Sequence, residues 1–419
     1  MILLTVAYVF NFVDRYILGL LVEPIKADLG LSDTQMGLLI GPAFAILYAA
    51  AGLPLGWLAD RMRRTLILGC GVALWSLATA ASSLARNFSQ LFLARVGVGV
   101  GEATLAPCAL SMISDSFPPE RRGRPIAFYT AAQSLGAGLA ALGGAAILGW
   151  AKSVDRLSLP MLGELKAWQF TFIVVGLPGL VVALLLFMTR EPARQERAAN
   201  EGGASIGATL VYLWERRGTY LSFVAFPLVM TTVAYSQTFF AALYMRTWDW
   251  PIERFALWSG LALVIIGPIT VNVAGWLSDR LYKRGRRDGP VRVMLAGSLL
   301  LIVMGALSPL MPTGELAFFV WLFNLVGMST VSAAAPIALL NIAPATMRGQ
   351  VSALFYMVTS LGGLLIGPPA VGLLTDNVFG TGGIQYATAL VPALFGLPVL
   401  LFAGFTRRRY LAESEMIGA

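Results

Sequence analysis

Long apolar runs alternate with short charged bunches along the whole sequence. Each run has about 20 residues, enough for one α-helix to cross the roughly 30 Å hydrocarbon core of a bilayer. Charged residues make up 12% of the chain, against about 25% in a soluble domain. A transmembrane barrel would instead show segments of about 10 residues that alternate apolar and polar. The pattern predicts an all-α integral membrane protein.

We expect twelve transmembrane helices, with boundaries good to about 2–4 residues. The first carries Asp14 and Arg15, which do not fit the short apolar stretch and cleavage site of a signal peptide, so we expect a permanent helix. The predicted spans cover residues 2–21, 36–58, 66–85, 90–113, 124–150, 168–188, 219–246, 254–278, 291–311, 315–340, 350–374 and 384–405.

The positive charges predict the orientation. Two of the 30 Lys and Arg residues lie in the middle of spans; of the others, 21 lie in one set of alternating loops, together with the C-terminal tail, and 7 in the other. This bias predicts that both termini face the cytoplasm, in a multi-pass protein of the inner membrane. The net charge of +8 is then a topology signal with some attraction for anionic lipids, not a sign of nucleic-acid binding.

Several function classes are disfavoured by residue type. The chain has no histidine, which excludes histidine-based metal sites, catalytic triads and proton relays, and it has two cysteines, both inside spans. We find no nucleophile–base pair, metal-ligand cluster or phosphate-binding loop. We therefore expect no enzyme activity, no cofactor and no metal; a membrane enzyme or receptor is the rival from another class.

An internal repeat divides the chain. Residues 56–64 read GWLADRMRR and residues 275–283 read GWLSDRLYK, while PPERRG at 118–123 is matched by PATMRG at 344–349. Two parallel six-helix repeats are a transporter layout, with the substrate site near the midplane between the halves. We expect an N-terminal bundle at 1–188, a cytoplasmic linker at 189–218, a C-terminal bundle at 219–405 and a cytoplasmic tail at 406–419.

The first copy of the repeat resembles the signature loop of the major facilitator superfamily, G-x-L-x-D-R-x-G-R, with Arg63 where glycine is usual. The resemblance implies the major facilitator fold and a cytoplasmic gate, in which the aspartate accepts from a helix N-terminus of the other half. The residues that carry over to this gate are Gly56, Asp60, Arg61 and Arg64, with Asp279 and Arg280 as counterparts in the second copy.

About the first 150 residues resemble the spinster subfamily more narrowly. The resemblance rests on YVFNFVDRYILGLLVEPIKADLGLSDTQMGLL, on WSLATA and on LARVGVGVGEATLAPCALSMISDSFPPERRG. In animals this subfamily implies transport of lysolipids or sphingoid lipids such as sphingosine-1-phosphate. Its bacterial members imply no settled substrate.

Four ionisable residues lie in the middle of apolar spans: Asp14, Arg15, Arg95 and Glu102. Each costs at least about 2.5–3.5 kcal/mol at a bilayer centre, so we expect them to face one another or a watery cavity. Arg95 and Glu102 share one face of their helix, about 10 Å apart along the axis, with room for a partner from the first helix between them. A static salt-bridge network is the structural alternative.

Roles follow from the chemistry of these groups. The Arg15 guanidinium offers a fork suited to a carboxylate or phosphate. Asp14 and Glu102 are the expected proton carriers, since a carboxylate can be held ionised by arginine in one state and protonated in another. We expect Arg95 and Asn11 to share in substrate binding, and among aromatics such as Phe44, Tyr235 and Phe239 we single out Tyr48, Tyr129 and Tyr356.

Two substrate classes remain open. The leading expectation is a monomeric, proton-coupled transporter of an amphipathic anionic lipid that works by alternating access. The few polar residues on the predicted tenth and eleventh spans favour a substrate with an apolar part. The alternative is a proton symporter of hydrophilic organic anions. The pattern of charged residues on the first and fourth spans also resembles that of anion–cation symporters of the superfamily. The expected partners are this small-molecule or lipid substrate, protons and membrane lipids.

Overall fold

The computed structural model describes residues 1–59, 61–117, 123–153, 157–159, 163–192, 206–344 and 347–418. They fall into two compact units, one drawn from Met1–Ala199 and Thr238–Val264 and the other from Asn200–Gln237 and Ile265–Ala419. The all-α membrane fold is confirmed, apart from one antiparallel hairpin in which Leu157 pairs with Leu165. The division into bundles at 188 and 219 stays a prediction.

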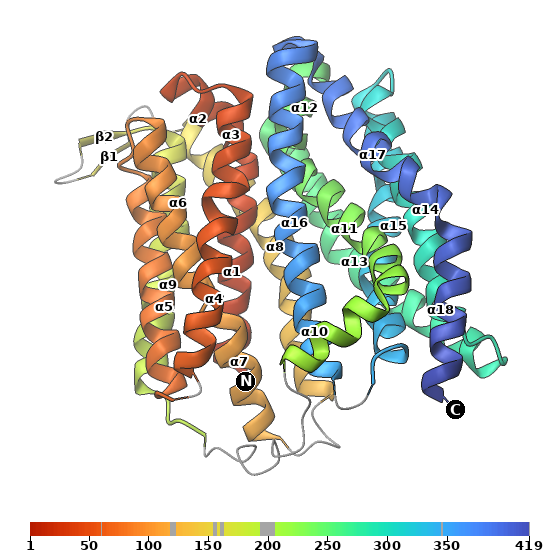
Figure 1. Ribbon diagram of the computed structural model, residues 1–419. Helices are drawn as coiled ribbons and strands as arrows, with labels where there is room; N and C mark the ends of the chain where they lie inside the picture. Colours follow the sequence, from red (N-terminus) through yellow and green to blue (C-terminus); the bar gives the residue numbers. More distant parts are fainter. Residues whose placement is uncertain are drawn as a thin grey trace. The chain divides into compact units, whose positions relative to one another are not determined.

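Among the described residues, the first unit holds ten α-helices, the start of another and the hairpin (Figure 1). Its elements are α1 (Ile2–Leu20), α2 (Val22–Leu29), α3 (Asp33–Ile40), α4 (Pro42–Ala59), α5 (Arg64–Ser82), α6 (Phe88–Glu102), α7 (Leu105–Ser116), α8 (Gly123–Ser153), β1 (Leu157–Leu159), β2 (Gly163–Leu165), α9 (Ala167–Met188), the 3-10 turn η4 (Gln237–Phe239), of which Gln237 belongs to the second unit, and α12 (Phe240–Trp248). The start of α13 (Ile252–Lys283) belongs to it as well.

The second unit contains the rest of α13. Its other elements are α10 (Ile206–Glu215), α11 (Arg217–Ser236), α14 (Gly289–Leu307), the 3-10 turn η5 (Ser308–Leu310), α15 (Gly314–Asn341), α16 (Arg348–Leu374), the π-helical turn η6 (Thr375–Phe379), the 3-10 turn η7 (Thr381–Gly383), α17 (Ile384–Leu401) and α18 (Ala403–Gly418). Within this unit α10 lies crosswise to the long helices (Figure 1).

Among the described residues, eleven segments are long and apolar enough to cross a membrane. The predicted fifth span, 124–150, lies in α8, whose apolar stretch is the shorter Leu135–Trp150. Four predicted spans are not single helices: 36–58 is broken at Gly41, 90–113 between α6 and α7, 219–246 at the 3-10 turn η4, and 384–405 at Phe402. Hydropathy measures how apolar a segment is and does not detect such a break in the helical backbone.

Close helix contacts hold the first unit together. A Cβ atom on Gly99 of α6 would lie 2.5 Å from the Phe44 carbonyl oxygen of α4, and one on Gly101 would lie 2.7 Å from the Gly71 carbonyl oxygen of α5. Real Cβ atoms do not approach this closely, so these positions require glycine for α6 to pack between its neighbours. The contact places the C-terminal end of α6, with Glu102, deep in the unit.

The second unit has its own core. Apolar side chains of α11, α14, α15, α16 and α18 pack together there, among them Phe223, Met294, Ala335 and Phe355. The Tyr220 hydroxyl is satisfied in this core, because it donates to the Ile342 carbonyl oxygen at 2.5 Å. Burial of these side chains accounts for the way α18 is held against the bundle.

Candidate functional site

The structure joins α1 to α6 through one buried ion pair. Arg15 donates from Nε to Oε2 of Glu102 at 2.7 Å, and the two side chains are 16% and 0% exposed. Glu102 is the last residue of α6, and the Thr104 hydroxyl donates to the Gly101 carbonyl oxygen at 2.8 Å where the helix ends. The break between α6 and α7 therefore lies directly at the charged residue.

Asp14, Arg95 and Asn11 complete a buried polar cluster, each with at most 2% of its surface exposed. Asp14 has Glu102, Arg95 and Thr79 as its electrostatic neighbours, and Asn11 lies beside Glu102. Several polar atoms have no hydrogen-bond partner among the described residues: Asp14 Oδ1, Asn11 Oδ1, Glu102 Oε1, and Arg95 Nε and Nη1. Buried polar groups are normally paired, so this cluster has unused capacity to bind a ligand or water.

Three aromatic rings lie close to the Arg15 guanidinium. Its Cζ atom lies 4.6 Å from the ring centre of Phe44, 5.3 Å from Tyr48 and 5.5 Å from Phe12. Phe44 and Tyr48 stack on each other at 5.3 Å. The sequence analysis did not single out Phe12, although it lies three residues before Arg15 and so on the same helix face. Such cation–π contacts orient the guanidinium without neutralising it.

The two other predicted tyrosines are placed differently. Tyr129 on α8 is buried, stacks on Tyr8 at 4.4 Å and has Tyr48 and Arg15 among its electrostatic neighbours. Its hydroxyl has no hydrogen-bond partner among the residues that the structure describes. Tyr356 belongs to the second unit, where it is 51% exposed and packs edge-on against Phe355 at 5.3 Å.

Of the predicted gate residues of the first repeat, Gly56 lies on α4, Arg61 follows the end of that helix and Arg64 begins α5. Asp60 is outside the described residues. Gly56 has open space where a Cβ would stand. Arg61 lies over the Trp57 ring at 4.0 Å, so its side chain folds back on its own helix.

The second repeat shows the same local arrangement within its own unit. Arg280 lies over the Trp276 ring at 4.9 Å, and Asp279 lines a hollow of about 390 Å³ with Trp276 and Lys283. The repeat in the sequence is therefore a repeat of local structure, and the gate itself remains a prediction.

Arg64, the last residue of the signature loop, is buried in an ion cluster of the first unit. Its Nε donates to Glu191 at 2.7 Å and Nη1 donates to Ser111 at 2.7 Å and to Asp115. Glu191 also accepts from the Thr65 amide at 3.0 Å, which caps the start of α5. Burial raises the pKa of Glu191, but the hydrogen bonds from Arg64 and Thr65 outweigh it, so the pKa lies below its ordinary value.

A second ion cluster in this unit joins α12 to α2 and α3. Arg246 donates from Nη1 and Nη2 to Asp33 at 2.8 and 2.7 Å, and from Nε to Glu23 at 2.9 Å. Lys26 pairs with Asp33 at 2.7 Å. This cluster was not predicted from the sequence, in which its signal is that all four charges lie at or near the ends of predicted spans. Among the described residues no group of His, Cys, Asp or Glu could hold a metal ion.

Comparisons with known proteins agree with this architecture. The sequence profile described as Major Facilitator Superfamily matches residues 4–287. A solved bacterial homologue of the human lysosomal transporter spinster, in an inward-facing and unoccupied conformation, superposes with a TM-score of 0.81 at 25% identity, over 99% of this chain and 96% of that one.

Two curated relatives carry other descriptions. An MFS-type efflux pump of Mycolicibacterium smegmatis is 30% identical over 389 residues, which span 90% of this chain and 83% of the pump. A probable L-galactonate transporter of Escherichia coli is 37% identical over 194 residues, which span 46% of this chain and 39% of that transporter.

Proposed function

Because the chain belongs to the Major Facilitator Superfamily, we propose that it is a secondary active transporter that moves an organic anion together with protons by alternating access. It is a multi-pass membrane transporter related to spinster, and not an enzyme. The observation that carries the proposal is the buried Arg15–Glu102 pair, set among polar atoms that lack partners in the described part of the chain.

Arg15 supplies the anion-binding group in this proposal. Its guanidinium has five N–H donors in a rigid fork, which matches a carboxylate or a phosphate. An arriving anion competes with Glu102 for these donors. Arg95 adds positive charge nearby, with Nε and Nη1 unpaired within the described residues, and Asn11 adds a neutral hydrogen-bonding group.

Coupling follows from that competition. When the substrate takes the Arg15 donors, Glu102 loses its counter-charge in a buried place, and an isolated buried carboxylate is costly. Glu102 then takes up a proton, with Asp14 as the neighbouring second carboxylate. The anion and the proton are thus carried together, and the Arg15–Glu102 pair re-forms once both have been released.

We propose that the substrate is amphipathic, a lysolipid or sphingoid-phosphate-like anion. Support comes from the aromatic wall of Phe12, Phe44 and Tyr48 around the charged group, and from the likeness to a spinster homologue. Tyr129 and, in the second unit, Tyr356 are further proposed contacts. On the basis of the loop charges, we propose that the protein lies in the inner membrane with both termini in the cytoplasm. We further propose that it works as a monomer.

A hydrophilic organic anion is the second candidate. The observation that favours it is the identity of 37% with a probable L-galactonate transporter. The Arg15 guanidinium would bind a sugar-acid carboxylate in the same way. The two candidate substrates differ in whether the ligand also has an apolar part.

Purified protein in sealed liposomes distinguishes the two candidates. We expect a pH gradient to drive accumulation of a labelled lysophospholipid, and excess unlabelled lysophospholipid to suppress it where L-galactonate does not. Accumulation of L-galactonate alone would transfer the assignment to the second candidate. Transport of both types that ignores the pH gradient would overturn proton coupling.

A further inference from the structure

The short helix α10 has two unlike faces. Its inner face is tied to the second unit, because the Thr209 hydroxyl donates to Gln350 at 2.5 Å and the Tyr212 hydroxyl donates to Glu413 at 2.9 Å. Its outer face presents Ile206, Leu210 and Trp214, which are 66%, 51% and 70% exposed. Spacing of four residues puts these three apolar side chains on one stripe. A crosswise helix with such a stripe is suited to lie in the plane of a membrane surface.

Near the start of α11, which follows this stripe, two arginines have no carboxylate partner in the described part of the chain. Arg217 begins α11 and donates only to the Trp214 carbonyl oxygen, at 3.1 Å. The Arg409 guanidinium of α18 lies 4.0 Å from where a Cβ on Gly218 would stand and 5.3 Å from the Phe405 ring. The neighbouring arginines do have carboxylate partners: Arg216 pairs with Glu413, and Arg407 pairs with Asp288. Two positive charges therefore gather at one exposed place.

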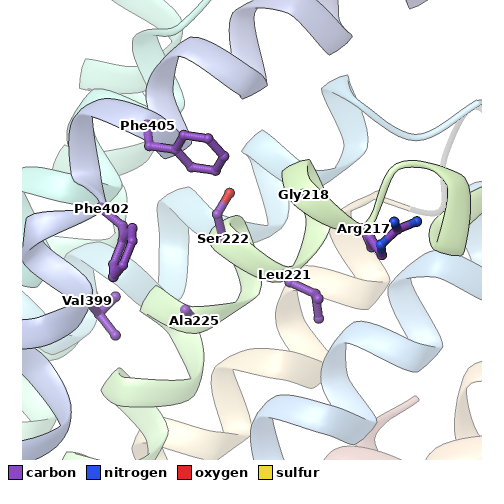
Figure 2. Close-up of a pocket in the computed structure, with 8 residues that line it drawn as sticks. All are labelled: Arg217, Gly218, Leu221, Ser222, Ala225, Val399, Phe402 and Phe405. Atoms are coloured by element: carbon purple, nitrogen blue, oxygen red, sulfur yellow. The ribbon is translucent and has the colours of Figure 1, made fainter.

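A pocket of about 440 Å³ opens from this place between α11 and the end of α17 (Figure 2). Leu221, Ser222 and Ala225 line one side, and Val399, Phe402 and Phe405 line the other. Arg217 lies at one end of the row and the two phenylalanines at the other (Figure 2). The pocket thus has a cationic end and an apolar body.

The position of the pocket relates it to the bilayer. Arg217 is the first residue of one candidate span, Arg217–Trp248, and Leu401 is the last residue of another, Thr381–Leu401. The pocket therefore lies at the depth where a membrane-spanning segment meets the headgroups of one leaflet. Tryptophan and arginine are the usual anchors at this depth.

We propose that this pocket holds an anionic phospholipid of the leaflet that the basic loops face. Its phosphate lies between Arg217 and Arg409, one acyl chain runs along Leu221, Val399 and Phe402, and α10 rests on the adjoining headgroups. The site lies within the second unit and does not depend on the substrate proposed above. Charge complementarity and the depth at the ends of two spans single out a membrane lipid over a protein partner.

Native mass spectrometry of the whole protein in detergent tests the proposal, with phosphatidylglycerol and phosphatidylcholine offered as probes. The variant carries Arg217→Ala with Arg409→Ala. The control carries Arg286→Ala with Arg287→Ala, which removes the same charge from an exposed loop. We expect the wild type and the control to retain phosphatidylglycerol over phosphatidylcholine, and the variant to lose about 30-fold of that retention, roughly fivefold for each arginine.

Two outcomes would overturn the proposal: equal retention of both lipids by the wild type, and full retention of phosphatidylglycerol by the variant. Equal thermal unfolding of both variants without lipid checks that neither is misfolded. A second readout is quenching of Trp214 fluorescence by brominated phosphatidylglycerol, taken as the wild type minus Trp214→Phe. Quenching is expected in the wild type; its absence, or a cross-link from Leu221→Cys to a second copy of the chain in place of lipid, would contradict the proposal.

Discussion

The Nε atom of Arg15 lies 2.7 Å from Oε2 of Glu102, a contact between residues 87 positions apart in the sequence. The pair is buried and links α1 to the C-terminal end of α6. A buried pair of this kind is poor evidence for stability, because desolvation offsets the attraction. Its two members have different expected roles, so substitutions at each should have different consequences.

Arg15→Ala should weaken binding of an anionic substrate, since it removes the bidentate donor. We expect a loss of tenfold or more in affinity, about 1.5–3 kcal/mol for a hydrogen bond to a charged group. Arg15→Lys keeps the charge without the fork and should recover only part of the affinity. Calorimetric or fluorescence titration in detergent measures this, and an unchanged dissociation constant for Arg15→Ala would remove Arg15 from the site.

Gly99→Ala should disturb the site from outside it. The new Cβ would lie 2.5 Å from the Phe44 carbonyl oxygen. This oxygen belongs to the backbone of α4, so the clash is relieved only if a helix shifts. We expect a cost of about 1–3 kcal/mol in unfolding free energy, with weaker substrate binding because the Phe44 ring lies 4.6 Å from Arg15.

The matched control is Gly143→Ala on α8, where nothing lies within 4 Å of the new Cβ. In a helix interior it should be neutral or stabilising by up to about 1 kcal/mol. Thermal unfolding in detergent compares the two variants. If they behave alike, close packing of α6 on α4 is not what positions Phe44.

Arg246→Ala should destabilise the first unit. It removes the cation that pairs with Glu23 and one of two cations that pair with Asp33, whose side chain is fully buried and which keeps Lys26. Removal of one partner from a buried ion pair costs about 3–5 kcal/mol, and the remaining lysine argues for the lower end. Arg86→Ala, at an exposed arginine of the same unit, is the control. Equal unfolding temperatures for both variants would mean that the Arg246 cluster contributes nothing.

Asp288 should make stability depend on pH. Burial raises the pKa of its carboxyl, but hydrogen bonds from Arg407 and Arg292 outweigh this and hold the pKa below the ordinary value of 3.8. A depressed folded-state pKa means that the stabilisation is present above about pH 3.8 and is lost as the pH falls further.

Asp288→Asn should therefore unfold at a lower temperature than the wild type at pH 7, and the gap should close as the pH falls below about 4. Thermal scans in detergent at a series of pH values measure the gap. A gap that stays constant down to pH 3 would show that the charge of Asp288 is not what stabilises the fold.

Much of the fold could be predicted from the sequence because a bilayer requires long apolar helices, and these are visible in composition alone. The repeat of GWLADR and GWLSDR predicted matching local structure, and both arginines indeed fold onto their tryptophans. The break after Glu102 was missed, because residues 90–113 stay apolar through it. The crosswise helix α10 was read as part of a polar linker, since ten residues are too few for a span.

The candidate site was predictable in its members and less so in its pairings. The free-energy cost of a charge at the bilayer centre singles out Asp14, Arg15, Arg95 and Glu102. Helix geometry left room between Arg95 and Glu102 for a partner from the first helix. The pairing of Arg15 with Glu102 depends on how α1 and α6 are placed within the first unit, which the spacing of residues along one helix does not encode. Arg64 shows the same limit, because its partner Asp115 lies 51 residues away and Glu191 lies 127 away.

Transport by Glu102→Gln in sealed liposomes tests proton coupling most directly. The amide mimics the protonated carboxyl and cannot release a proton. We expect substrate to bind with measurable affinity, exchange across the membrane to persist, and accumulation driven by a pH gradient to be abolished. Normal accumulation by Glu102→Gln under a pH gradient would contradict the account and would transfer the proton role to Asp14 or remove it.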